Sequence, residues 1–154
     1  MRLPAIRLLT PADWARSYLG YPPVQHAQPN KTHFALSALS AAGWTRELIT
    51  QNVDRLHHKA ALDEEAAEKD ILELHGALNK VICFSCSATF PRSPFQTHLS
   101  ELNPAWAEYA EKLERRQIEP KLNPDGDVDL GGRSYDDFNV PRCYKCGENS
   151  IRTS

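Results

Sequence analysis

The chain has 154 residues, with 18 lysines and arginines against 20 acidic residues and a formal net charge of −2. Its length fits a single domain with a real core, and its 41% hydrophobic and 25% charged residues exclude collagen, coiled coil and bulk disorder. No apolar run approaches the ~18 residues of a membrane helix. The near-neutral charge argues against a protein that holds nucleic acid mainly through phosphate contacts.

The first third of the chain predicts one clear helix after a break. Residues 1–10 carry two arginines and no acid, which gives thin support for a transit peptide. Residues 22–30 are rich in proline and predict a break. A helix is expected to start after Asn30 or Thr32 and to end before Gly43.

Two short strands are predicted in the middle of the chain. Residues 48–50 predict a buried strand, and the stretch from 54 to 60 begins a helix. The acidic run 63–70 is polar all round, which is typical of a solvated surface insertion. A second strand, at residues 71–74, ends at a His-Gly pair.

The last part of the chain predicts a hairpin, a helix and a loop. Strands on both sides of the first cysteine pair form the hairpin, within residues 81–90. Asn103 as cap and Pro104 as first helical residue start the helix. Residues 120–134 contain prolines and glycines and predict a loop. The apolar stripe of the helix comprises Trp106, Tyr109, Ala110 and Leu113.

The four cysteines form two C-x-x-C pairs, Cys83 with Cys86 and Cys143 with Cys146. Two such pairs can close a tetrahedral shell of four thiolates around zinc, and the long spacer predicts an insertion between them. Disulfides are the alternative, but they need an oxidising compartment and the chain shows no secretory signal peptide. A redox C-x-x-C normally occurs once, at a helix start. The sequence therefore predicts one structural zinc.

A polar segment follows the first predicted strand, where ligands bind in open α/β sheets. Gln51 and Asn52 offer amides suited to sugar hydroxyls or a carboxamide. Asp54 could accept from such a ligand or cap the next helix. His75 ends the second strand and precedes Gly76. It is a candidate general base, although a lone histidine is more often structural.

These motifs together resemble one family. Residues 50–57, T-Q-N-V-D-R-L-H, are similar to the T-Q-N-[VI]-D-x-L-H segment of sirtuins, and residues 72–76, L-E-L-H-G, to their catalytic histidine motif. The four cysteines match their zinc tetrad, and order and spacing agree from about residue 12 to 150. Further likenesses, such as L-N-P-A-W at 102–106 and P-D-G-D-V at 124–128, point to the class II mitochondrial branch of lipoamidase and ADP-ribosyltransferase type.

The resemblance implies NAD-dependent removal of acyl groups from protein lysines, with transfer to ADP-ribose and release of nicotinamide. An acyl-lysine protein or peptide would be the partner, and the mitochondrial matrix the compartment. His75 would be the catalytic base, Gln51 would contact the ribose, and Asn52 and Asp54 would line the nicotinamide pocket. Lipoamide removal and ADP-ribosyl transfer are the alternatives within the family.

The implied fold is α/β: a partial Rossmann-like parallel sheet over residues 1–80 and a zinc-ribbon lobe over 81–154. The family's glycine-rich phosphate loop and its strand after the second cysteine pair have no counterpart here, which predicts a truncated chain that is silent by itself. Ala61 stands where the family has glycine and would cost about 1 kcal/mol in a left-handed conformation. A non-catalytic zinc-binding interaction module is the reading from a different class. A nucleic-acid-binding ribbon is disfavoured because no basic stripe lies between the cysteine pairs.

Overall fold

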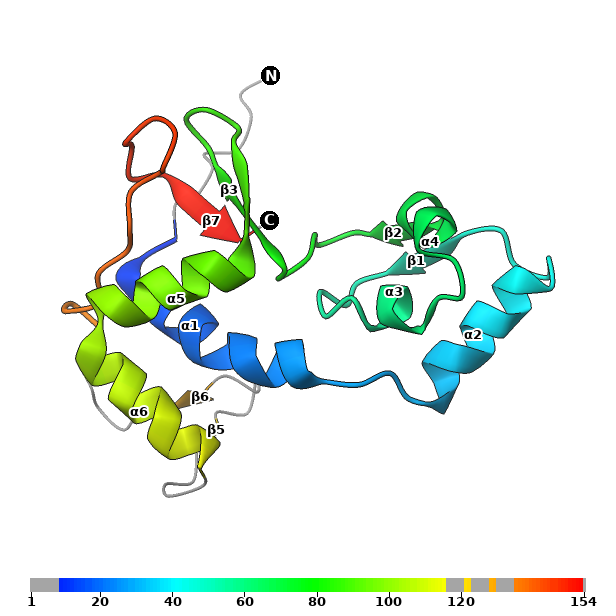
Figure 1. Ribbon diagram of the computed structural model, residues 1–154, viewed down its shortest axis with the longest axis horizontal. Helices are drawn as coiled ribbons and strands as arrows, with labels where there is room; N and C mark the ends of the chain where they lie inside the picture. Colours follow the sequence, from blue (N-terminus) through cyan, green and yellow to red (C-terminus); the bar gives the residue numbers. More distant parts are fainter. Residues whose placement is uncertain (1–8, 116–120, 123–127, 130–134, 154) are drawn as a thin grey trace. The chain divides into compact units, whose positions relative to one another are not determined.

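The computed structural model describes residues 9–115, 121–122, 128–129 and 135–153 (Figure 1). Its described residues form two compact units. Unit 1 contains the residues up to Pro22 together with Val81–Thr153, and unit 2 contains Pro23–Lys80. The sequence assigned residues 1–80 to one domain, whereas the structure groups the described residues before Pro23 with the cysteine-containing part. The reason is the apolar face of the first helix, which belongs to the core of unit 1. None of the described helices is long and apolar enough to cross a membrane.

Unit 2 is built around a pair of parallel strands. β1 (Leu48–Thr50) and β2 (Ile71–Glu73) pair in parallel, with Leu48 opposite Ile71 and Thr50 opposite Glu73. Parallel strands need a long crossover, and here helices α3 (Leu56–Ala60) and α4 (Glu64–Asp70) provide it. Helix α2 (Lys31–Ala41) precedes β1. The predicted α/β class with a parallel sheet is thereby confirmed.

Helix α2 begins and ends as predicted. The Asn30 side chain accepts hydrogen bonds from the backbone N–H groups of Thr32 and His33, and Gly43 adopts a left-handed conformation, with φ 77°, after the last turn. No residue of α2 is buried, and Trp44 just beyond it is 81% exposed. Phe34 and Leu39 of this helix are exposed, whereas Leu36 is half-buried.

Two local expectations in unit 2 do not hold, the burial of residues 48–50 and the left-handed conformation considered for Ala61. The strand at residues 48–50 is not buried, because Ile49 is 61% exposed and Leu72 beside it 56%. The acidic run lies mostly on the surface, as predicted, and forms α4, where the Asp63 side chain accepts a hydrogen bond from the N–H of Ala66. Ala61 is extended, with φ −67°, so the expected left-handed cost does not arise.

Unit 1 packs helices and a small antiparallel sheet around one core. The first helix, α1 (Pro11–His26), starts in this unit, and α5 (Arg92–Leu102) and α6 (Pro104–Glu114) follow the hairpin. The sheet has the order β4-β3-β7, from β3 (Lys80–Cys83), β4 (Thr89–Pro91) and β7 (Ile151–Thr153). The core comprises Trp14, Ala15, Tyr18, Leu19, Val81, Cys83, Phe95, Leu99, Trp106, Phe138, Cys143 and Ile151.

The stretch predicted as loop at 120–134 contains a short strand pair. β5 (Lys121–Leu122) and β6 (Val128–Asp129) pair antiparallel, and the remaining residues of that stretch lie outside the described residues. The loop prediction is therefore wrong for these four residues. The stripe of α6 is as predicted: Trp106 lies in the core, with Tyr109, Ala110 and Leu113 packed against it.

Helix α1 runs through the predicted break to His26, although it contains Pro22 and Pro23. A proline has no backbone N–H, so the Tyr18 carbonyl, four residues before Pro22, loses its helical donor. The Gln96 side chain replaces this donor, with Nε2 lying 2.7 Å from the Tyr18 carbonyl oxygen. A side chain on α5 thus satisfies the carbonyl group that the proline leaves open.

Asn103 does not cap α6 with its side chain, contrary to the prediction. It is buried, and its Nδ2 donates to the carbonyls of Leu99 and Asn139, both at 2.8 Å. Its Oδ1 accepts from the Asn139 N–H at 2.7 Å. Asn103 therefore ties the junction of α5 and α6 to the segment that leads into the second cysteine pair.

Asn103→Ala is expected to lower the free energy of unfolding by about 2 kcal/mol, because it removes the three hydrogen bonds that the buried Asn103 side chain makes to the backbone of Leu99 and Asn139. Urea denaturation followed by tryptophan fluorescence measures the change. Asn149→Ala, at an exposed asparagine, is the matched control and should change stability little. Equal stability of the two variants would contradict the role given to Asn103.

Candidate functional site

The four cysteines converge at one end of unit 1. Cys83 ends β3, Cys86 lies in the turn after it, and Cys143 and Cys146 lie in the turn region before β7. All four sulfurs lie within 4.8 Å of one another. The Sγ atoms of Cys83 and Cys146 are 3.6 Å apart, and those of Cys86 and Cys143 are 3.7 Å apart.

This cluster fits zinc. Four thiolates at ~2.3 Å from a tetrahedral ion would lie roughly 3.8 Å from one another, close to the observed spacings. The Ser150 hydroxyl, 3.2 Å from the Cys83 sulfur, helps lower the pKa of that thiol to about 6. The N–H of Lys145 donates to the Cys143 sulfur. Four protein ligands fill the shell, so the ion would be structural, with no position for a reactive water.

The other predicted site residues gather at the carboxyl edge of the strand pair in unit 2. Gln51, Asn52 and Asp54 follow β1, and His75 follows β2. Because the two strands are parallel neighbours, both segments leave the sheet at the same edge. Gln51, Asn52 and His75 are exposed there, while Asp54 is half-buried.

Backbone hydrogen bonds join the two segments. The N–H of Leu74 donates to the Thr50 carbonyl at 2.9 Å, and the N–H of Leu78 donates to the Val53 carbonyl at 3.0 Å. His75 lies between the two donors along the chain. The structure thus joins the polar segment and the segment that carries His75 at one edge of the strand pair.

Asp54 has a local structural role in this structure. Its Oδ1 accepts a hydrogen bond from the N–H of Leu56 at 2.9 Å, at the start of α3. Arg55 occupies the N-cap position of α3, so Asp54 binds the first turn from one residue before the cap. The second carboxylate oxygen leaves it capacity to accept from a ligand as well.

A charged network lies behind this edge, and the sequence analysis missed it. Arg55 forms ion pairs with Glu68 on α4 and with Glu73 on β2, and Glu73 also faces His58, with 3.6 Å between Oε1 and Nδ1. Burial raises the pKa of Glu73 and, together with Arg55, lowers the pKa of His58. Two charged residues in the sequence pointed to it: Glu73, two residues before His75, and Arg55, directly after Asp54.

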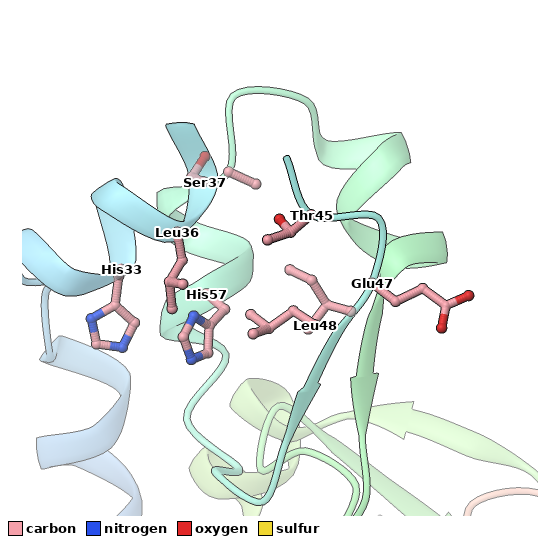
Figure 2. Close-up of a pocket in the computed structure, with 9 residues that line it drawn as sticks. His33, Leu36, Ser37, Thr45, Glu47, Leu48 and His57 are labelled. Carbon is pink, nitrogen blue, oxygen red and sulfur yellow. The ribbon is translucent and has the colours of Figure 1, made fainter. Parts of the chain in front are cut away.

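A small cavity of about 70 Å³ lies between α2 and α3. Helix α3 also carries His58 of the charged network. Figure 2 shows the imidazoles of His33 and His57 side by side at its wall, while the Glu47 carboxylate points away from them. Their ring centroids are 4.6 Å apart. Burial and the neighbouring His33 lower the pKa of His57. The two tilted rings lie in contact between α2 and α3 and pack these helices together.

The chain is similar to a known family of proteins. The model of the Sir2 family matches residues 5–153. The chain is 41% identical over 140 residues to the NAD-dependent protein deacylase SRT2 of Arabidopsis thaliana, covering 86% of this chain and 36% of that protein. It is 42% identical over 134 residues to an NAD-dependent protein deacetylase of Xanthomonas campestris pv. campestris, covering 87% of this chain and 41% of the relative.

Among solved structures, a Sir2 homologue mutant in complex with ADP ribose has a TM-score of 0.54 and 28% sequence identity, covering 93% of this chain and 39% of that one. A Sir2–p53 peptide–NAD+ structure has a TM-score of 0.56 at 24% identity, which supports the fold. The chain spans about two fifths of the length of these relatives.

Proposed function

The chain belongs to the Sir2 family, and we propose that it carries the nicotinamide-side residues and the catalytic base of an NAD-dependent protein-lysine deacylase. One observation carries this proposal: the T-Q-N-V-D segment and His75 both follow strands that end at the same edge of the parallel pair. Relatives that bear the names NAD-dependent protein deacylase and deacetylase support it.

In the proposed reaction, NAD is a substrate that supplies an electrophilic ribose carbon and nicotinamide as leaving group. Gln51 and Asn52, both exposed at the strand edge, present amide donors and acceptors for the ribose hydroxyls and the carboxamide. Asp54, whose side chain is fixed by the N–H of Leu56, lines the nicotinamide side. Holding the reacting groups in this way can supply part of the roughly 7–11 kcal/mol available from proximity.

His75 is assigned the proton transfer. Its exposed imidazole can accept the proton of a ribose hydroxyl, and this hydroxyl oxygen can then bond to the acyl carbon. Before this step the carbonyl oxygen of the acyl-lysine displaces nicotinamide from the ribose carbon. After it, the bond between the acyl carbon and the lysine nitrogen breaks, the amine leaves with a proton, and one water is consumed, so that the products are lysine, nicotinamide and acyl-ADP-ribose. The cysteine cluster takes no part in this chemistry and would hold unit 1 together through zinc.

The proposal is tested by grafting residues 12–150 in place of the matching segment of the Xanthomonas campestris relative. With an acetyl-lysine peptide and NAD, mass spectrometry should find nicotinamide and acyl-ADP-ribose in equal amounts. A folded, zinc-loaded graft that releases neither product would contradict it. It would favour instead a zinc-binding interaction module.

The finer specificity is a separate proposal. The class II likeness at residues 102–106 and 124–128 favours lipoyl-lysine as substrate, or ADP-ribosyl transfer to protein, in the mitochondrial matrix. A panel of acetyl- and lipoyl-lysine peptides decides the first point, with a higher kcat/KM for lipoyl-lysine expected. Labelled ADP-ribose left on a protein acceptor would support the transferase alternative.

A further inference from the structure

Arg55 has an unusual backbone conformation at a critical place. It follows Asp54 directly, precedes α3, and is left-handed, with φ 58° and ψ 20°. Side chains with a Cβ rarely adopt this conformation, and glycine would adopt it freely. Such a residue persists where its surroundings hold it, and these positions cluster at functional sites.

The side chain of Arg55 explains how the conformation is held. Its Nη1 donates to Glu73 Oε2 at 3.3 Å, and its Nη2 pairs with Glu68 Oε1. The Arg55 and Glu73 side chains are only 16% and 12% exposed, whereas that of Glu68 is 55% exposed. The pair with Glu73 is therefore the better shielded of the two, and it links the polar segment after β1 to the end of β2.

The ion pair with Glu73 is one of three connections between the two segments that form the candidate site. The other two are backbone hydrogen bonds. The Leu74 N–H donates to the Thr50 carbonyl at the strand ends, and the Leu78 N–H donates to the Val53 carbonyl farther along both segments. His75 lies within the segment between Leu74 and Leu78. On the other side, the predicted ribose and nicotinamide contacts lie between Thr50 and Arg55.

We propose that Arg55 is a positioning residue, whose guanidinium, anchored on Glu73, fixes the segment 51–54 in register with His75. The role it serves rests on the proposed deacylase function, but the positioning itself is a property of this chain. Arg55 touches no reacting atom in this account. It acts by holding the left-handed turn and the end of β2 as one unit.

The test uses the full chain, its zinc added, and solution NMR. In Arg55→Gly the turn keeps a residue suited to its conformation, while both ion pairs are lost. Amide hydrogen exchange at Leu74 and Leu78 should become about tenfold faster or more, the effect of losing a charge-assisted hydrogen bond. The imidazole signals of His75 should shift as well, and Arg55→Lys should restore part of both effects.

Matched variants separate this role from general stability. Glu73→Gln should reproduce the changes of Arg55→Gly, and Glu68→Gln, which removes only the exposed pair, should change little. Amides of unit 1, such as Phe84 and Cys143, should exchange as before. Unchanged exchange and an unchanged His75 signal in both Arg55→Gly and Glu73→Gln would overturn the proposal.

If Arg55→Gly unfolds unit 2, Glu73→Gln alone decides, by the same two signals. Uniformly faster exchange throughout unit 2, with no rescue by Arg55→Lys, would also overturn the proposal, because it would mark a purely structural ion pair. None of these readouts requires turnover. A failed deacylation assay therefore counts against the proposed function, and the NMR result counts for or against Arg55.

Discussion

Removal of zinc is expected to unfold the part of unit 1 that contains β4-β3-β7. Two of the ligands, Cys83 and Cys143, belong to the core of this unit, so losing the ion would leave buried sulfurs without their common partner. Structural zinc contributes ~10–16 kcal/mol in small domains, more than a domain of this size has to spare. A strong chelator should therefore abolish the cooperative thermal transition seen by circular dichroism.

The ligand variant Cys146→Ser, in the second pair, should lose zinc and unfold. Lys145→Ala is its control, because it keeps all four sulfurs and the backbone N–H that donates to Cys143. Elemental analysis should give one zinc per chain for the unmodified protein and for this control. A chain that folds cooperatively without metal would show that the cluster has another role.

His75→Ala is expected to lower kcat by about 10²–10⁴-fold in the active graft, the usual contribution of a positioned proton-transfer group. Zinc content and thermal stability should stay unchanged, because the imidazole is exposed and no core packing is lost. Nicotinamide release and acyl transfer, followed by mass spectrometry, give the rate.

His98→Ala is the matched control for this variant. His98 lies in unit 1, where its Nδ1 contacts the Tyr144 hydroxyl at 2.9 Å. The His98→Ala variant should therefore leave kcat unchanged. A His75→Ala variant that keeps its rate while properly folded would show that His75 is structural. A variant that misfolds, with zinc lost, would show the same.

Local sequence signals predicted the parts that local interactions determine. Asn30 and Gly43 set the ends of α2 because cap and left-handed residue act within one turn. The two C-x-x-C pairs predicted the sulfur cluster, because the spacing within each pair brings two sulfurs to one side.

Features that depend on partners far along the chain could not be predicted from local sequence. Pro22 indicated a break, but Gln96, far along the chain, satisfies the Tyr18 carbonyl and lets α1 continue. Asparagine is a common N-cap residue, yet the Asn103 side chain forms its hydrogen bonds with the backbone of Asn139 instead. Such overrides arise because a polar side chain binds whichever backbone group the fold places beside it.

The candidate site shows the same division. The sequence analysis assigned Gln51 and Asn52 to the end of one strand and His75 to the end of another. The structure adds that these two strands pair in parallel and so share a carboxyl edge. The network behind them was missed, since nothing in the spacing of Arg55, Glu68 and Glu73 shows that a left-handed turn brings them together. The catalytic and binding roles of the site residues remain predictions.

One measurement tests the central claim most directly: titration of NAD into the active graft, followed by the side-chain NMR signals of Gln51, Asn52 and His75. The account predicts that these three signals shift together and saturably, while the Trp106 indole signal in the core of unit 1 stays in place. Turnover with no shift at these residues, or saturable shifts confined to the cavity of His33 and His57, would contradict it.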